Sequence, residues 1–487
     1  MSLSLAFNTS RSSLLTTSTQ LAVSSRNVAG AGDPSISRKI AVTTTAVDGS
    51  TRVVTISRAT GTALFGRMLG STSVSAGQVA LLEGLTRLQQ TVGDTEDTTS
   101  PAAQLGVFEN ALASAANTPD STILAQAAVT AAQDLATALN SATDVVQKVR
   151  SDADSQIAIS VAKINDLLTQ FQTENNTVIK GTVNGADITD ALDRRDALLS
   201  KLSEEIGIST VTRSNNDIVI YTDSGATLFE TSPRAVSFQS SPVLDASTAG
   251  KSVFVDGVAV TGSTATMPIK SGRIAGLTEL RDEVTVTYQT QLDEIARALV
   301  TAFAETDQTG GTAPAAAGLF TVSAGVSTIP SVLTPGLAGT ITVNALADPG
   351  QGGDTDLVRD GGFNGAAYQY NTSGAASFRT RLQEQSDALG AARTYDGTTS
   401  LANNVDLSAF ATSSVSWLQG VRKAVSGSVD SEQAVLSQAS NALSNATGIN
   451  LDQEYATQLE LERSYQASSK LISVVNQLFD SLFAMIR

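Results

Sequence analysis

The chain has 487 residues, with 31 Lys and Arg against 47 Asp and Glu and with no His or Cys. Its formal net charge of −16 repels nucleic-acid phosphates and anionic membrane surfaces, so we expect neither as a partner. The absence of His and Cys excludes Ser-His-Asp triads, thiol nucleophiles, disulfides and the commonest metal ligands. We therefore expect a protein that is not an enzyme and that holds no cofactor or metal.

The N-terminus lacks the pattern of a cleavable secretion signal. Met1 to Phe7 alternates Ser with apolar residues, and the first basic residue is Arg11. No apolar run approaches the roughly 18 residues that a membrane-spanning helix needs. We expect no membrane insertion and, if the protein is exported, a route that leaves its N-terminus intact.

A seven-residue repeat marks the first expected helix. Its apolar positions are Phe7, Leu14, Leu21 and Val28, and the intervening positions are Ser10, Thr17 and Ser24. This is half of a coiled-coil seam, with small polar residues in the other half, and it predicts a helix that pairs with another.

The middle of the chain changes pattern several times. Ile40–Ile56 predicts a β-hairpin that turns at Asp48-Gly49. Ser121–Thr173 is rich in Ala and free of Pro and Gly, which predicts a helical rod of roughly 80 Å. The other expected elements are a helix at Gln78–Val92, a short Thr/Val segment ending at Asn184-Gly185, a helix at Asp187–Ile206, strands within Ile208–Phe238 and Val253–Val260, a long return helix at Ile274–Glu305, a Gly/Thr-rich insert at Thr309–Thr399 and a helix at Asn403–Leu443.

The charged groups on the Asp187–Ile206 helix include residue types that can serve as catalytic acids and bases. A general acid and base would need carboxylate pairs such as Asp193 with Asp196 or Glu204 with Glu205, but we expect a solvated helix face. Arg195 is expected in a surface ion pair. Gly250–Ser252 lacks the earlier Gly of a phosphate loop and Gly350–Asp356 lacks calcium-ligand spacing, so we expect a turn and a solvated loop there.

The C-terminal pattern is stronger. Leu461, Tyr465, Ser468, Ile472, Val475, Phe479, Leu482 and Ile486 alternate steps of four and three, and Leu471, Leu478 and Met485 form a second apolar row beside them. Burying the seam contributes roughly 10–20 kcal/mol, whereas ordering about 30 residues costs on the order of 30–60 kcal/mol. We expect both tails to be mobile in the monomer and to fold against each other within an assembly, which amide hydrogen exchange would test.

The motifs at the two ends resemble the signatures of the rod, hook and hook-associated proteins of bacterial flagella. At the N-terminus they are Ser18–Val23, Asn27-Val28-Ala29 and Ser37-Arg38, and at the C-terminus Gly448–Asp452 with Glu454, Tyr465–Ser468 and Lys470-Leu471-Ile472. Internal segments are similar to the first hook-associated proteins: Asp190, Asp193, Arg195-Asp196 and Leu198-Leu199 with Leu202-Ser203; Gly272–Leu277 with Arg281-Asp282 and Gln291–Asp293; Gly318-Leu319-Phe320; and Asp348-Pro349 with Leu357 and Arg359–Gly362.

The resemblance implies a structural subunit that is exported unfolded through the flagellar channel to an extracellular position. It implies a homo-oligomeric ring between hook and filament, whose partners are the hook protein and the filament-side junction protein. It also implies a cytoplasmic export chaperone on the C-terminal helix.

We therefore expect an α+β multidomain fold. The expected units are a terminal-helix coiled coil (1–35 with 450–487), a helical domain with a β-hairpin (36–174 with 403–449) and a β-containing outer domain (175–402, with the return helix at 274–305 and the insert at 309–399). Alternatives are another axial flagellar protein, such as the hook protein or the second junction protein, and a secreted adhesin or lytic enzyme with a helical stalk.

Overall fold

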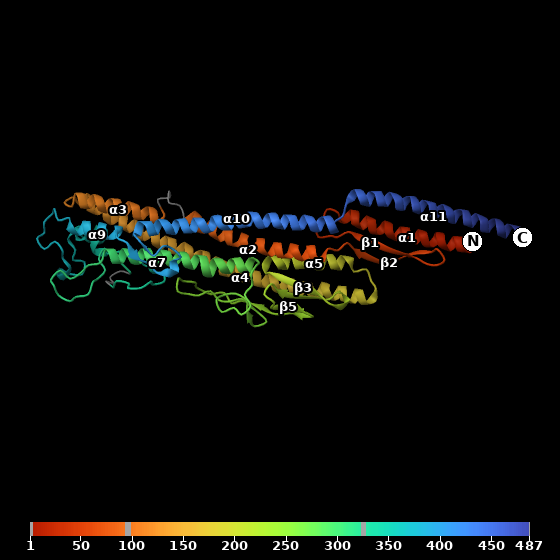
Figure 1. Cartoon of the computed structure of the whole chain (residues 1–487), viewed down its shortest axis with the longest axis horizontal. Helices are drawn as coiled ribbons and strands as arrows, with labels where there is room; N and C mark the ends of the chain where they lie inside the picture. Colours follow the sequence, from red (N-terminus) through yellow and green to blue (C-terminus); the bar gives the residue numbers. More distant parts are fainter. Residues whose placement is uncertain (1–2, 93–98, 323–327, 487) are drawn as a thin grey trace.

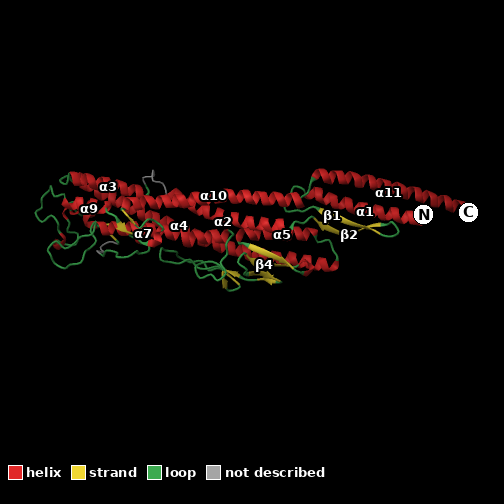
Figure 2. Ribbon diagram, in the orientation of Figure 1, coloured by secondary structure: helices red, strands yellow, loops and turns green. Residues whose placement is uncertain are grey.

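The molecule is a long rod with both chain ends at the same tip (Figure 1). This computed structural model describes residues 3–92, 99–322 and 328–486. Helices run along the whole rod, and the small sheets lie on one flank and beside α1 (Figure 2). The predicted α+β multidomain class is confirmed.

The longest helix runs along the part of the rod that does not include the chain ends (Figure 1). α4 (Thr122–Asn184) has 63 residues, or about 95 Å at 1.5 Å per residue. Ser121 caps its first turn, and Gly185 ends it in the left-handed conformation, with φ of 68°. The predicted rod is confirmed, but the separate Thr/Val segment expected before Asn184-Gly185 is wrong. That stretch continues the helix because Val178 is buried and Thr182 donates to the Val178 carbonyl.

The other long helices pack along α4 and along one another. α2 lies against α10 and α6, while α3, α5 and α7 contact α4. Their bounds are α2 (Thr62–Val92), α3 (Pro101–Asn117), α5 (Thr189–Glu205), α6 (Arg273–Glu279), a π-helical turn (Leu280–Val284), α7 (Thr285–Ala302) and α10 (Leu407–Thr447). The predicted return helix is thus α6, the π turn and α7 in succession. α3 was not predicted, although Ser100 caps it and Pro101 begins it.

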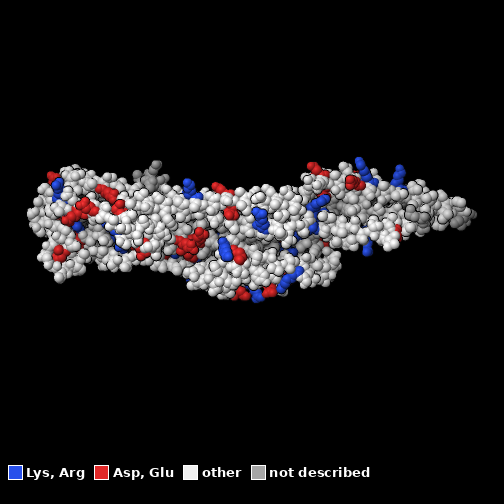
Figure 3. All heavy atoms as spheres, in the orientation of Figure 1, with Lys and Arg blue, Asp and Glu red and all other residues white. Residues whose placement is uncertain are grey.

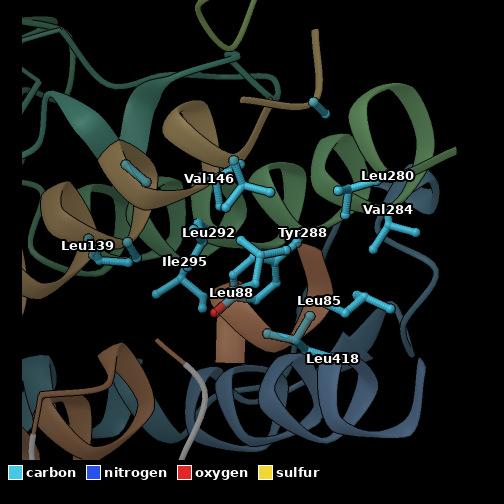
Figure 4. Close-up of a cluster of buried hydrophobic side chains, with 14 of the residues drawn as sticks. Leu85, Leu88, Leu139, Val146, Leu280, Val284, Tyr288, Leu292, Ile295 and Leu418 are labelled. Atoms are coloured by element: carbon cyan, nitrogen blue, oxygen red, sulfur yellow. The ribbon is translucent and has the colours of Figure 1, made fainter. Parts of the chain in front are cut away.

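One continuous apolar core lies between these helices. Figure 4 shows part of it, where Leu85 and Leu88 of α2 meet Leu292 and Ile295 of α7. Its buried members begin at Leu69 and end at Leu418, and among the described residues none comes from the two ends of the chain. We call residues 61–447, which contain this core, the body.

The body also contains small antiparallel sheets. One has the order β3–β4–β5–β6, and another has the order β7–β8–β9. The bounds are β3 (Ile208–Thr212), β4 (Ile218–Thr222), β5 (Thr227–Glu230), β6 (Ser232–Pro233), β7 (Val236–Ser237), β8 (Phe254–Val255), β9 (Val258–Ala259), β10 (Phe320–Thr321), β11 (Thr342–Val343), β12 (Arg393–Thr394) and β13 (Asn404–Val405). β10 pairs with β11, and β12 with β13. Gly250–Ser252 is irregular chain and not the expected turn; the turn before β8 lies earlier, where the Thr248 N–H donates to the Asp245 carbonyl.

The insert between α7 and α10 is mostly loop, with two short helices, α8 (Leu357–Asp360) and α9 (Thr380–Gly390). Two buried carboxylates hold its loops in place, Asp293 of α7 and Glu305 just after the end of α7. Asp293 accepts from the backbone N–H groups of Gly336 and Ala338, at 2.8 and 2.9 Å. Glu305 accepts from the backbone N–H groups of residues 362–364. Both carboxylates are about 1% exposed, so they replace the water that loop N–H groups would otherwise bind.

Asp293 should make stability depend on pH. Burial raises its pKa from 3.8 to about 6, against the opposing effect of its hydrogen bonds. Because the folded state holds the proton more tightly, its contribution to stability is full below about pH 3.8 and is lost as the pH rises through 6. When the pH falls from 7 to 4, the unfolding free energy of the parent should therefore rise by roughly 3 kcal/mol more than that of an Asp293→Asn variant, as measured by urea unfolding. Parallel pH profiles for the two proteins would contradict this.

The two ends of the chain form a separate unit, which we call the arm. It consists of α1 (Leu3–Gly30), the hairpin β1 (Lys39–Thr45) and β2 (Thr51–Arg58), and α11 (Leu451–Ile486). α1 packs antiparallel to α11 and against the hairpin (Figure 1). The predicted hairpin is confirmed, with Gly49 in the left-handed conformation at its turn. α10 ends at Gly448, where the chain turns into α11.

Candidate functional site

On α1, the burial of the two halves of the predicted seam is the reverse of the expectation. Phe7, Leu14, Leu21 and Val28 are only half-buried, whereas the small residues Ser10, Thr17 and Ser24 are at most 8% exposed. Small side chains let α1 and α11 approach closely and form hydrogen bonds across the contact. Ser13 lies 3.1 Å from the Ser468 hydroxyl, for example. The tight part of this pair is therefore polar.

The predicted seam on α11 is divided between a covered and an uncovered side. Val475 is buried, and Leu461, Ile472 and Phe479 are half-buried. Tyr465 and Leu482 are exposed, and the side chain of Ile486 lies outside the described part of the chain. In this chain alone, one side of the predicted seam thus has no cover.

The second apolar row of α11 is the most exposed apolar feature of the arm. We call Leu471, Leu478 and Met485 the outer row; they are 56%, 50% and 83% exposed. Val474 and Phe483, beside this row, are also exposed. The face of the arm in Figure 3 carries few charges toward its end. A contiguous apolar strip on a monomer marks a contact surface for another molecule.

Residues from the two terminal motifs meet at the base of the arm. Glu454 of α11 is 2% exposed and accepts hydrogen bonds from Ser24 and Arg38, both at 2.7 Å. These hydrogen bonds more than offset burial, so the pKa of Glu454 lies below its ordinary value. Asn27 of α1 exchanges two hydrogen bonds with the backbone of Lys39, each 2.9 Å long. The motif residues therefore join α1, the start of the hairpin and the start of α11 into one unit.

A cluster of charged groups then joins this unit to α5. We call it the polar joint: Arg26, Lys39 and Arg58 of the arm with Asp187, Asp190, Asp193 and Asp196 of the body. Asp193 lies at its centre and accepts from Ser37, from Lys39 Nζ at 3.2 Å and from Arg58 Nη1 at 2.9 Å. It is 5% exposed, and Lys39 is 4% exposed.

The expectation of a solvated face at Asp193 and Asp196 is therefore wrong. The charges that cover these carboxylates come from the hairpin, more than 130 residues away in sequence. Burial raises the pKa of Asp196 despite its ion pair with Arg58. Burial also opposes ionisation of Asp190, but hydrogen bonds and charges from Lys39 and Arg26 lower its pKa overall.

Two further charged residues of α5 are also buried. The surface ion pair expected for Arg195 is wrong, because its side chain is 4% exposed and donates to Asn175 and to the Asn216 carbonyl. Burial lowers its pKa to about 10. Glu205 is 4% exposed and pairs with Lys163 at 2.6 Å, whereas its neighbour Glu204 is exposed as predicted.

The polar joint suits a structural role, in which it holds the arm on the body, and the outer row suits contact with another molecule. In the described part of the chain, no group of three or more acidic side chains is placed to bind a metal ion. The described helices also include none that is both long enough and apolar enough to cross a membrane. The family motif pointed to the carboxylates of α5, but no signal in the sequence marked Lys39 and Arg58 as their partners.

Two family models match this chain. Residues 85–319 match the helical domain of the flagellar hook-associated protein FlgK. Residues 440–485 match the C-terminal region of the flagellar basal body rod proteins FlgEFG. The second match covers nearly all of α11, and the first covers the body from the last part of α2 through α7. The chain belongs to the flagellar hook-associated protein family. It is a structural component of the flagellum.

One solved structure of the family matches over part of its length. It is the flagellar hook junction protein FlgK from Burkholderia pseudomallei, with 20% sequence identity and a TM-score of 0.42. The match covers 53% of this chain and 47% of that protein, so the matched part spans about half of the relative. No curated protein sequence matches this hook-associated chain.

Proposed function

We propose that this hook-associated protein forms the junction between the flagellar hook and the filament, as a ring of identical subunits that contact one another through their arms. The observation that carries the proposal is the outer row of α11. α1 covers the neighbouring side of α11, which carries Ser468 and Val475, so the outer row beside it remains for a second molecule. The two family matches make an axial neighbour the expected occupant.

The same proposal includes the route and the partners. The subunit is exported unfolded to an extracellular position, and its neighbours are the hook protein and the filament-side junction protein. Before export, a cytoplasmic chaperone covers the exposed apolar side of α11. The protein is not an enzyme. The expected mobility of both tails in the free monomer stays a prediction, as do the three domain ranges and the seam residues as subunit contacts.

The outer row provides a direct test. A Leu471→Glu/Leu478→Glu variant should fail to cap isolated hook fragments, because each charge would have to lose its water inside the contact. Losing the burial of two Leu side chains alone costs roughly 3–6 kcal/mol per contact. Electron microscopy of hook fragments mixed with purified protein should show end-on caps with the parent and at least tenfold fewer with the variant.

A matched control adds the same charge to the polar stripe of α11. Ser473 and Gln477 are exposed and lie beside Asp480, so a Ser473→Glu/Gln477→Glu variant should cap hooks like the parent. Equal capping by the outer-row variant would exclude this contact surface. Decoration of the sides of the hook by the parent would favour the alternative of another axial role, and no binding at all would favour a stalked adhesin.

A further inference from the structure

The apolar core of the body does not continue into the arm. Among the described residues, its buried members all lie between Leu69 and Leu418. Inside the arm, α1 packs on both α11 and the hairpin. The arm and the body are thus two separately packed units, and what joins them determines the angle between them.

The connection is polar. Two chain segments cross it, residues 59–61 and residues 448–450, and the backbone N–H of Arg38 donates to the Thr447 carbonyl at the end of α10. The ion pairs of the polar joint also connect arm and body, together with hydrogen bonds from Ser37 to Asp193 and from Arg26 to Thr189. Arg26 contacts Asp187 and Asp190 at 2.7 and 2.8 Å, with 36% of its side chain exposed.

The ion pairs differ in how well they are shielded from solvent. The Arg26 pairs at the edge are partly exposed and easily screened by salt. Asp193 at the centre is shielded, and it contacts both strands of the hairpin, through Lys39 of β1 and Arg58 of β2. Because Asn27 fixes the backbone of Lys39 to α1, a contact to Asp193 fixes the whole arm.

We infer that the polar joint is a hinge between arm and body, and that Asp193 is the positioning residue that holds it at one angle. When the ion pairs at Asp193 are lost, the arm turns as a unit about residues 59–61 and 448–450 while its own helix pair stays intact. The hinge belongs to the monomer and does not depend on the proposed place of the protein in the flagellum.

The chain has no Cys, so pairs of spin labels can be placed on the full-length protein without removing any native thiol. Ser464 of α11 and Asn176 of α4 are both exposed, and Cys substitutions there report the distance from arm to body. Asn8 of α1 and Ser464 are exposed within the arm, and that second pair reports whether the arm itself stays intact.

The test is the distance distribution measured by pulsed electron spin resonance in the parent, in Asp193→Asn and in Asp152→Asn. Asp152 belongs to a half-exposed ion pair with Arg87 inside the body and serves as the matched control. We expect Asp193→Asn to widen the arm-to-body distribution at least twofold, with the distribution within the arm unchanged and with Asp152→Asn like the parent. Raising salt from 0.1 to 1 M shortens the screening length from about 10 to 3 Å, and should widen the parent distribution less than Asp193→Asn does, because salt screens the exposed Arg26 pairs but not the shielded contacts of Asp193. The inference is overturned if the arm-to-body distribution stays narrow in Asp193→Asn, or if the distribution within the arm widens equally.

Discussion

A Gly276→Val substitution should cost at least about 3 kcal/mol of unfolding free energy, because α2 and α6 cross with their backbones in contact. A Cβ atom at Gly276 would lie 2.0 Å from the carbonyl oxygen of Gly77, far inside contact distance. The obstacle is backbone, so no side-chain rotation relieves it. The two helices would have to separate. The close contact between Gly84, further along α2, and Leu280 would then open as well.

The measurement is urea unfolding followed by circular dichroism, with Gly70→Ala as the control. Gly70 lies on the same helix α2, and a Cβ atom there would meet nothing within 4 Å. Ala at an open helix position should stabilise the protein by about 0.5–1 kcal/mol, because Gly is the poorer helix former. A Gly276→Val protein as stable as the parent would show that α2 and α6 do not pack this closely.

Replacing Arg281 with Leu should also destabilise the body, by roughly 3–5 kcal/mol. Arg281 is completely buried in the π turn and donates to Asp154 at 2.6 Å and to the Lys251 carbonyl at 2.8 Å. Without it, the 2% exposed carboxylate of Asp154 keeps the N–H of Ser241 but loses its countercharge. An unpaired charge at such a site costs far more than the lost bond itself.

A double variant separates the lost countercharge from the lost packing. Arg281→Leu/Asp154→Leu removes both charges and should recover at least half of the stability lost in the single variant, as measured by thermal unfolding. The exposed pair of Asp152 and Arg87 provides the comparison, and Asp152→Asn should change stability by less than about 1 kcal/mol. If Arg281→Leu also changes stability by less than about 1 kcal/mol, the ion pair of Arg281 and Asp154 does not stabilise the body.

Local signals in the sequence were sufficient wherever one short segment decides the outcome. The Pro- and Gly-free stretch from Ser121 predicted α4, and Asp48-Gly49 predicted the hairpin turn, because capping and turn formation depend on adjacent residues. The seven-residue repeats at both ends predicted that α1 and α11 pair, since helical periodicity places these residues on one face. The motifs at the two ends of the chain indicated the rod, hook and hook-associated class, and the internal segments indicated the hook-associated proteins within it.

Only the tertiary structure decided which side chains are covered. Asp193 reads as solvated until Lys39, 154 residues earlier in the chain, is placed against it. The closely packed half of the α1 seam consists of Ser and Thr, because the distance between two helices depends on both of them and not on the apolar pattern of one. Periodicity and turn chemistry are properties of neighbouring residues, whereas the burial of a charge depends on partners that only the folded chain brings together.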